Sequence, residues 1–320
     1  MTKKERVLAA IHHEAVDHVP SGFSLHFDPA LHNTPGEIRA HLDFFEQTDT
    51  DIQKIMNENL VPDFGPVTVP EDWQAMGSYS RDADFIQRQA TFTKRLLEQA
   101  SQDAYNLGTL HGIVASAIHP IEHRYGYEAV RALQCQHLRS GKPYQWDAMR
   151  RIADALCYLA EEYAKAGVDG IYFASLGGEA RYFTDEEFAR YIAPLDMQIM
   201  SAAKEAGLDV FLHACKDGLV MERYQSYLPL TDVINWGIRD NPRYTLAVGR
   251  ELFPNVTLMG GLSNGPESPL HRGTAQDIRQ AVAAVLEQAG TGSFILGADC
   301  TLPPDTPYEN FRVAAHATRQ

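Results

Sequence analysis

The sequence has few basic residues for its length, and this shortage excludes several classes of partner. Its 28 lysines and arginines stand against 42 aspartates and glutamates, which gives a formal net charge of −14 at pH 7. Proteins that bind nucleic acids or anionic membranes by charge need clustered Lys and Arg to neutralise phosphates. The sequence contains no such basic cluster. We therefore expect neither nucleic acid nor a membrane surface among its partners.

Long apolar runs and closely spaced cysteines are also missing. No apolar run approaches the roughly 20 residues of a membrane-spanning helix. The N-terminal residues, MTKKERVLAAI, are typical of an amphipathic helix rather than of a signal peptide. The four cysteines are too widely separated for the disulfide framework of a small secreted protein; they are Cys135, Cys157, Cys215 and Cys300. We expect a cytoplasmic protein with reduced thiols.

What the sequence does contain is an alternation of strand-like and helix-like segments. Apolar runs of strand type lie at residues 19–27, 52–56, 106–115, 170–174, 210–214, 233–236, 256–261 and 293–297. Amphipathic helical patterns between them cover residues 85–104, 146–166, 184–206 and 275–289. Such alternation with short connections is typical of parallel α/β sheets. No linker divides the chain, so we predict one domain, residues 1–320. We expect it to fold as a single (β/α)8 TIM barrel with an N-terminal helical extension, rather than as two doubly wound domains.

Three residues near the ends of predicted strands carry the side chains of a metal site. His213 and Cys215 lie two positions apart in VFLHACKDG (210–218), so the imidazole and the thiol point to the same face of the fifth predicted strand. Cys300 follows the eighth predicted strand in FILGADCTLPP (294–304). Strand ends of a parallel barrel open onto a common mouth. Two thiolates and one imidazole suit Zn²⁺ and leave a fourth position open; the alternative is a pair of buried structural thiols.

Motifs at both ends of the chain resemble the uroporphyrinogen decarboxylase superfamily. They are KERVLAAIHHE (4–14) followed by DHVP (17–20), and GADCTLPPDTPYEN (297–310). Within that superfamily, His-x-Cys followed much later by Cys is similar to the zinc signature of the corrinoid-dependent methyltransferases, the branch that includes the methylcobamide:coenzyme M methyltransferases. The resemblance implies a TIM barrel, zinc held by His213, Cys215 and Cys300, and methyl transfer from a methyl-corrinoid to an acceptor.

Departures from the decarboxylase pattern point away from porphyrinogen chemistry. The resemblance implies that the decarboxylase has an arginine-rich N-terminal loop, which helps to bind the eight carboxylates of its substrate. The first forty residues of this chain contain two arginines, Arg6 and Arg39. The pyrrole-binding aspartate of the decarboxylase corresponds to Glu58, so a carboxylate is kept there. Its late histidine is replaced by the stretch that carries Cys300. A decarboxylase-like lyase is the second interpretation.

A zinc ion at the triad would explain how a thiol becomes the methyl acceptor. A free thiol has a pKa of about 8.5, and binding to Zn²⁺ deprotonates it. We therefore expect a small-molecule acceptor of thiol type, with a folate acceptor as an alternative. A corrinoid-carrier-binding or zinc-storage barrel without turnover is disfavoured because one coordination position stays open. The chain has no Asp-x-His-x-x-Gly corrinoid-binding signature, so the methyl-corrinoid should arrive on a partner corrinoid protein.

Other residues near predicted strand ends are further candidates for the site. Glu58 and Glu179 could take catalytic roles, Glu179 as a transient fourth metal ligand, although a loop carboxylate is often simply solvated. Trp236 could contact the corrinoid or the substrate, with packing as the alternative. Asn264, after Gly-Gly-Leu-Ser, could bind a polar group, with capping of the next helix as the alternative. The remaining candidates for the pocket wall are Tyr182, His111 and His119.

Overall fold

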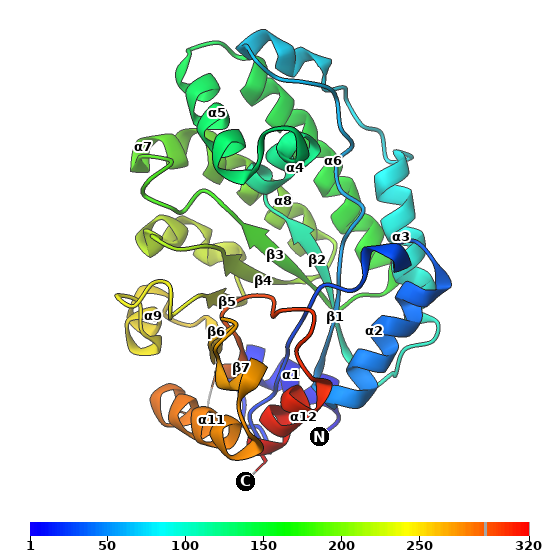
Figure 1. Cartoon of the computed structure of the whole chain (residues 1–320), viewed down its shortest axis with the longest axis vertical. Coiled ribbons are helices and arrows are strands. Elements are labelled where there is room, and N and C mark those ends of the chain that lie inside the picture. Colours follow the sequence, from blue (N-terminus) through cyan, green and yellow to red (C-terminus); the bar gives the residue numbers. More distant parts are fainter. Residues whose placement is uncertain (291–292, 320) are drawn as a thin grey trace.

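A parallel β-sheet forms the centre of the computed structural model, which describes residues 1–290 and 293–319. Seven strands follow one another in space in their order along the chain, and every neighbouring pair is parallel (Figure 1). The strands are β1 (Ile52–Ile55), β2 (Tyr105–His111), β3 (Gly170–Ser175), β4 (Asp209–Ala214), β5 (Val233–Trp236), β6 (Thr257–Leu262) and β7 (Phe294–Ala298). This arrangement confirms the α/β class and is consistent with a TIM-like fold.

Helices connect the strands and cover the outside of the sheet (Figure 1). They are α1 (Lys3–Ile11), α2 (Pro35–Thr48), α3 (Asp84–Leu97), α4 (Ile113–Tyr125), α5 (Tyr127–Arg139), α6 (Tyr144–Ala166), α7 (Asp185–Glu187), α8 (Ala193–Glu205), α9 (Leu246–Leu252), α10 (Pro269–Arg272), α11 (Ala275–Ala289) and α12 (Tyr308–Ala317). Short 3-10 helices lie at Pro29–Leu31, Pro70–Ala75 and Met221–Leu230, and a π-helical turn at Phe188–Ile192 precedes α8. Across the described residues, the search for a helix long and apolar enough to cross a membrane finds none.

The first predicted strand, 19–27, is not a regular strand in the structure. Its residues form only isolated parallel bridges, among them Ser21 with Leu296 of β7. The Leu296 N–H donates to the carbonyl oxygen of Pro20 (2.8 Å), and the Ile52 N–H of β1 donates to that of Ser21 (3.1 Å). The segment thus lies between β7 and β1, where an eighth strand would lie. Regular pairing does not continue along the segment, which forms isolated bridges at Ser21 and Leu25, and the eight-stranded barrel is not confirmed.

Side chains that point to the inner side of the sheet form a second, smaller core. It consists of Val7, Ala10, Ile11, Ile52, Tyr105, Leu107, Tyr172, Phe211, Val233, Met259 and Ile295. Its first three members come from α1, which contacts β1, β2 and β7. The predicted N-terminal helix therefore closes the amino-terminal side of the interior with apolar side chains. The larger core fills the space between the sheet and the outer helices, which leaves the carboxyl ends of the strands for polar groups.

Candidate metal centre

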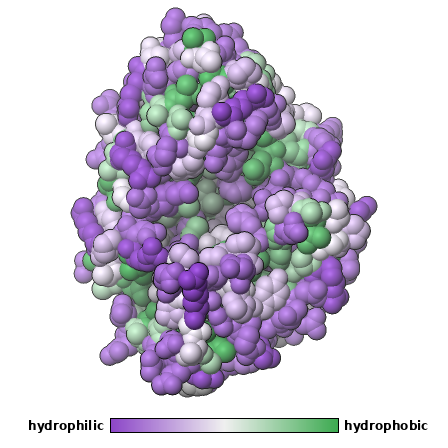
Figure 2. All heavy atoms as spheres, viewed as in Figure 1, coloured by the Kyte–Doolittle hydropathy of each residue, from purple (hydrophilic) through white to green (hydrophobic). Residues whose placement is uncertain are grey.

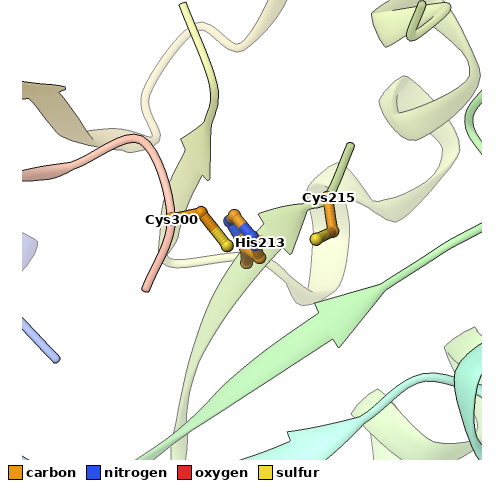
Figure 3. A group of neighbouring side chains, drawn as sticks. All are labelled: His213, Cys215 and Cys300. Carbon is orange, nitrogen blue, oxygen red and sulfur yellow. The ribbon is translucent and has the colours of Figure 1, made fainter. Parts of the chain in front are cut away.

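His213, Cys215 and Cys300 meet at the carboxyl ends of β4 and β7. Their ligand atoms, one imidazole nitrogen and two sulfurs, all lie within 4.8 Å of one another. Figure 3 shows the two cysteines on either side of the His213 ring, Cys215 just beyond the end of β4 and Cys300 from the segment that follows β7. The structure thus brings together the three residues predicted from the sequence, although Cys215 and Cys300 are 85 positions apart along the chain.

The end of β4 fixes the first two side chains. The Cys215 N–H donates to the Ser175 carbonyl oxygen (3.0 Å), which extends the pairing of β4 with β3 one residue beyond the strand. Because alternate residues of a strand share a face, His213 and Cys215 both point inward. Lys216 then turns the chain with a left-handed φ of 84°, and the Asn241 side-chain amide holds that turn by donating to the Lys216 carbonyl oxygen (2.9 Å).

Asp299 fixes the position of Cys300. Its N–H donates to the Leu262 carbonyl oxygen at the end of β6 (2.7 Å), and its Oδ2 accepts from the Arg239 N–H (3.1 Å). Burial raises the pKa of Asp299 to about 6. The segment after β7 is thereby tied to the ends of two neighbouring strands, so the thiol of Cys300 is held at a defined place.

The His213 imidazole is buried without a hydrogen-bond partner on either nitrogen among the described residues. Its ring stacks on Tyr172, with centroids 5.1 Å apart and planes at 24°. The Tyr172 hydroxyl donates to Asn235 Oδ1 (2.8 Å), and Asn235 Nδ2 donates to the Ala298 carbonyl oxygen (3.1 Å). Buried polar atoms without partners are rare and costly. A metal ion bound by one of these nitrogens fits the donor set, which is that of a zinc site.

The two thiols lie close enough to affect each other's acidity. Their mutual interaction lowers the pKa of Cys300 well below its usual value, against the effect of burial and with further help from the nearby His213 and Lys54. The same interaction, together with burial, raises the pKa of Cys215 well above its usual value. Two neighbouring thiols that compete for protons are suited to a cation that takes the place of a proton.

A cavity of about 330 Å³ opens above the triad, and His213, Cys215 and Cys300 all line it. Its other polar lining residues are His26, Lys54, Asn57, Glu58, Thr109, His111, His119, Glu122, Tyr127, Tyr172, Lys216 and Thr301. Figure 2 shows the side of the molecule seen in Figure 1 as a mostly hydrophilic surface that is hollowed near its middle. The volume suits a small molecule, and the triad faces it.

Three of the further predicted residues line this cavity. Glu58 accepts a hydrogen bond from His26 Nδ1 (2.8 Å); burial acts to raise the pKa of Glu58, but this bond and the charge of His26 outweigh burial and lower it. The rings of His111 and His119 meet edge to face, with centroids 4.9 Å apart. Burial lowers the pKa of His111 well below its usual value and that of His119 to about 4. Both imidazoles are therefore neutral near pH 7.

Glu179 lies outside the cavity lining, in a fully buried ion pair. Its carboxylate accepts two hydrogen bonds from Arg131 (2.9 and 3.2 Å) and one from the Gly177 N–H (2.7 Å). The Arg131 guanidinium also lies 4.1 Å from the ring centroid of Tyr182. Removing one partner of such a pair leaves a buried charge. Glu179 is thus placed to hold the loop after β3, and its predicted role as a ligand stays a prediction.

Trp236 and Asn264 are also outside the residues that line the cavity. Trp236 is 1% exposed, its Nε1–H donates to the Tyr244 carbonyl oxygen (2.8 Å), and its ring lies against Gly249 of α9. Asn264 Nδ2 donates to the carbonyl oxygen of Thr301, a cavity residue (3.1 Å). Trp236 therefore has the environment of a packing residue, whereas Asn264 connects the loop after β6 to the segment that carries Cys300.

Sequence reasoning missed Lys54, which lies on β1 beside the triad. Its Nζ donates to Ser24 Oγ (3.1 Å) and lies 3.5 Å from the ring centroid of Tyr172. Burial lowers the pKa of Lys54 to about 8, while Cys300 and Cys215 act in the opposite direction. The sequence did hold a signal for Lys54. It lies two positions after Ile52 in a predicted strand, so its side chain shares a face with that core residue.

The fold and the site define a class of protein: a parallel α/β protein of TIM-like architecture with a candidate His-Cys-Cys metal centre at the carboxyl ends of its strands. The chain belongs to the uroporphyrinogen decarboxylase (URO-D) family, whose model matches residues 54–320. This match confirms the family resemblance and includes the C-terminal motif, residues 297–310; the N-terminal motifs lie before the matched range. A search of curated proteins found no significant sequence match.

Solved structures of two methyl-transferring proteins share the fold. A methyltransferase from Methanosarcina mazei superposes with a TM-score of 0.75 at 17% identity, covering 99% of this chain and 98% of its own. A B12-independent methionine synthase from Shewanella sp. W3-18-1, in complex with selenomethionine, gives a TM-score of 0.53 at 15% identity over 94% of this chain and 92% of its own. At these identities the likeness establishes a common fold, and function must be argued from the site.

Proposed function

We propose that this chain is a zinc-dependent methyltransferase that moves a methyl group from a methyl-corrinoid, carried by a partner protein, to a small thiol acceptor. The observation that supports it most directly is the convergence of His213, Cys215 and Cys300 within 4.8 Å, with both nitrogens of the imidazole lacking partners among the described residues. Three ligands leave room for an exogenous one, as in catalytic zinc sites. The shared fold with two methyl-transferring proteins agrees with this class of reaction.

One imidazole nitrogen of His213 and the sulfurs of Cys215 and Cys300 would hold the zinc. Bound zinc would supply one piece of chemistry, the conversion of an acceptor thiol into a thiolate at neutral pH. In the proposed transfer, a sulfur–carbon bond would form as the carbon–cobalt bond breaks, and the electron pair of the broken bond would stay on cobalt. The thiol proton leaves to solvent when the acceptor binds. The neutral His111 and His119 give that acceptor a wall without added charge.

The size of the cavity supports a corrinoid that approaches from outside. A space of about 330 Å³ accommodates a small acceptor, whereas a corrinoid is much larger, so its reactive face would have to meet the cavity at the mouth. We propose Glu58, which lines the cavity, as a catalytic contact to the acceptor; Glu179, Trp236 and Asn264 would act on the site through the loops that they hold. We also propose that residues 1–320 form one domain, because α1 and the strand ends enclose one interior.

The test is demethylation of methylcobalamin by the zinc-loaded protein in the presence of a small thiol. We expect loss of the methylcobalamin absorbance and formation of the methylated thiol, detected by mass spectrometry. The Cys215→Ala variant should lose about 100-fold or more in rate, because the acceptor can no longer be activated. Cys157→Ala is the matched control, since Cys157 lies on α6, outside the cavity lining, and bonds to the Gln198 carbonyl oxygen and side chain. Undiminished turnover in Cys215→Ala would refute the zinc mechanism; turnover with a folate and not with thiols would refute the acceptor class.

A further inference from the structure

Lys54 places an ammonium group in the cavity that the two thiols also line, and the described residues give it no carboxylate partner. Among the described residues it has no ion-pair partner within 4.0 Å; its contacts are the Ser24 hydroxyl (3.1 Å) and the ring of Tyr172 (3.5 Å to the centroid). Glu58 lines the same cavity, but it is paired with His26 (2.8 Å). A buried cation without an anion is unfavourable, and a hydroxyl and an aromatic face offset only part of that cost.

Tyr172 connects Lys54 to the metal ligands, because its ring contacts both Lys54 and His213. Tyr172 contacts Lys54 with its ring and stacks on His213, with ring centroids 5.1 Å apart. The Tyr172 hydroxyl is anchored on Asn235 (2.8 Å). Lys54 and Cys300 also line one small recess together, at the base of the cavity. The ammonium is therefore held on the Tyr172 ring in the cavity that the metal ligands line, rather than free to swing into solvent.

The net charge of the zinc complex depends on which ligand takes the fourth position. Zinc with two thiolates and a neutral imidazole has no net charge, because +2 and −2 cancel. A thiolate acceptor in the fourth position gives the complex one negative charge, in a cavity whose His111 and His119 are neutral near pH 7. A neutral ligand in that position adds no charge.

We propose that Lys54 is a positioning residue that holds the acceptor as a thiolate on the metal, by neutralising the single negative charge that the complex gains when the acceptor binds. This rests on the proposed function above. The recognised class of ligand is any small acceptor that binds through an anionic sulfur, whatever the rest of the molecule carries. Lys54 accordingly selects thiols over neutral donors of similar size.

The experiment compares three ligands on the zinc-loaded protein by isothermal titration calorimetry. 2-Mercaptoethanol is anionic only at its metal-bound sulfur, 3-mercaptopropionate carries an additional carboxylate, and imidazole stays neutral. In Lys54→Met we expect both thiols to bind at least about tenfold more weakly, a loss of the size that one nearby charge produces, and imidazole to change less than about twofold. Lys54→Arg, which keeps the charge, should stay within about threefold of the wild type for all three ligands.

Several results would overturn the inference. An equal loss for imidazole and the thiols in Lys54→Met would mean that Lys54 shapes the metal site itself. A loss confined to 3-mercaptopropionate would mean that Lys54 binds a charge on the acceptor's tail. Zinc content and thermal unfolding of each variant check that the site and the fold are intact. A wild-type protein that binds zinc but no thiol overturns both this inference and the proposed function, whereas unchanged thiol binding in Lys54→Met overturns this inference alone.

Discussion

At the scale of single residues, the candidate centre holds His213 in a fixed position while its ring nitrogens lack hydrogen-bond partners among the described residues. His213 is in register with Ala174 of β3 and Asn235 of β5, so its backbone is fixed on both sides. Its two ring nitrogens nevertheless have no hydrogen-bond partner among the described residues. An imidazole held in place, unpaired and next to two thiols, fits the metal site proposed above.

Removal of one thiol should remove the metal. We expect the purified wild type to hold about one Zn²⁺ per chain, and Cys215→Ala or Cys300→Ala to hold less than about a fifth of that, because two protein ligands bind Zn²⁺ far more weakly than three. Elemental analysis after dialysis measures this directly. Cys135→Ala is the control, since Cys135 is buried on α5 and its thiol donates to the Tyr182 carbonyl oxygen (3.3 Å).

The fold should survive the loss of this metal. The interior below the centre is filled by apolar side chains from α1 and the strands, and the outer core is continuous between sheet and helices. Metal-free protein should therefore keep the circular dichroism spectrum of the zinc form. Full zinc occupancy in both single variants would show that the triad is a pair of structural thiols beside a buried histidine.

At the scale of elements, the sequence patterns located seven strands and misjudged two segments. The predicted strands from 52–56 onward correspond to β1 through β7. The pattern 106–115 ran too far, because β2 ends at His111 and the apolar residues from Ile113 onward begin α4; short apolar runs do not distinguish a buried helix from a strand. In 19–27, an apolar run predicted a strand, but the segment forms only isolated bridges to neighbouring residues among those described.

The candidate site shows the same division between local pattern and three-dimensional context. The metal triad was predictable because spacing within a strand and position at strand ends depend only on sequence order. Lys54 and Asn235 were missed because their importance comes from neighbours on other strands: Tyr172 lies next to both. For Trp236 the sequence offered contact with the corrinoid or substrate, or packing; its ring lies against Gly249 of α9, as the packing alternative expects, and the binding role stays a prediction.

The contact between α9 and β5 yields a prediction about packing. A Cβ added at Gly249 would overlap the ring of Trp236, which is 1% exposed. Alanine would gain up to about 1 kcal/mol of helix propensity over glycine, but overpacking costs about 1–3 kcal/mol, so Gly249→Ala should lower the free energy of unfolding by up to about 2 kcal/mol. Urea titration measures it, with exposed Glu251→Ala in the same helix as a control expected within about 0.5 kcal/mol of the wild type. A more stable Gly249→Ala would mean that Trp236 moves aside freely.

At the scale of the whole molecule, buried neutral histidines should make the fold sensitive to acid. His41 is the clearest case: its Nδ1–H donates to the Glu37 carbonyl oxygen (2.9 Å) and its Nε2 accepts from the Met56 N–H (3.1 Å). Burial lowers the pKa of His41 from the usual 6.5 to about 4. Protons therefore bind the unfolded chain more tightly, and His41's contribution, fully present above pH 6.5, is lost as the pH falls toward 4.

That loss amounts to about 3 kcal/mol, because the shift of about 2.5 pKa units is worth about 1.4 kcal/mol per unit. Urea unfolding at pH 7 and pH 4.5 should show a smaller difference in His41→Gln than in the wild type, since glutamine does not titrate. His12→Gln, at an exposed residue after α1, should leave the difference unchanged. An identical pH dependence in His41→Gln and wild type would mean that other groups govern the acid response.

The distribution of arginine over the whole molecule decides between methyl transfer and porphyrinogen decarboxylation. Arg6 bonds to Asp17 and Asp51 at the amino-terminal side of the interior, and Arg39 pairs with Asp43 on the surface. Among the described residues that line the cavity, arginine is missing, and the lysines are Lys54 and Lys216.

A substrate with eight carboxylates would enter that cavity with most of its charges unpaired, and each such charge carries a desolvation cost that cationic partners would otherwise offset. We therefore expect the zinc-loaded protein to produce no coproporphyrinogen from uroporphyrinogen above a control without enzyme, in a timed chromatographic assay. Methylcobalamin demethylation by the same preparation shows that the protein is active. Coproporphyrinogen that accumulates in proportion to protein would place this chain among the lyases of its family and would assign the triad to another task, because no decarboxylation step requires an activated thiol.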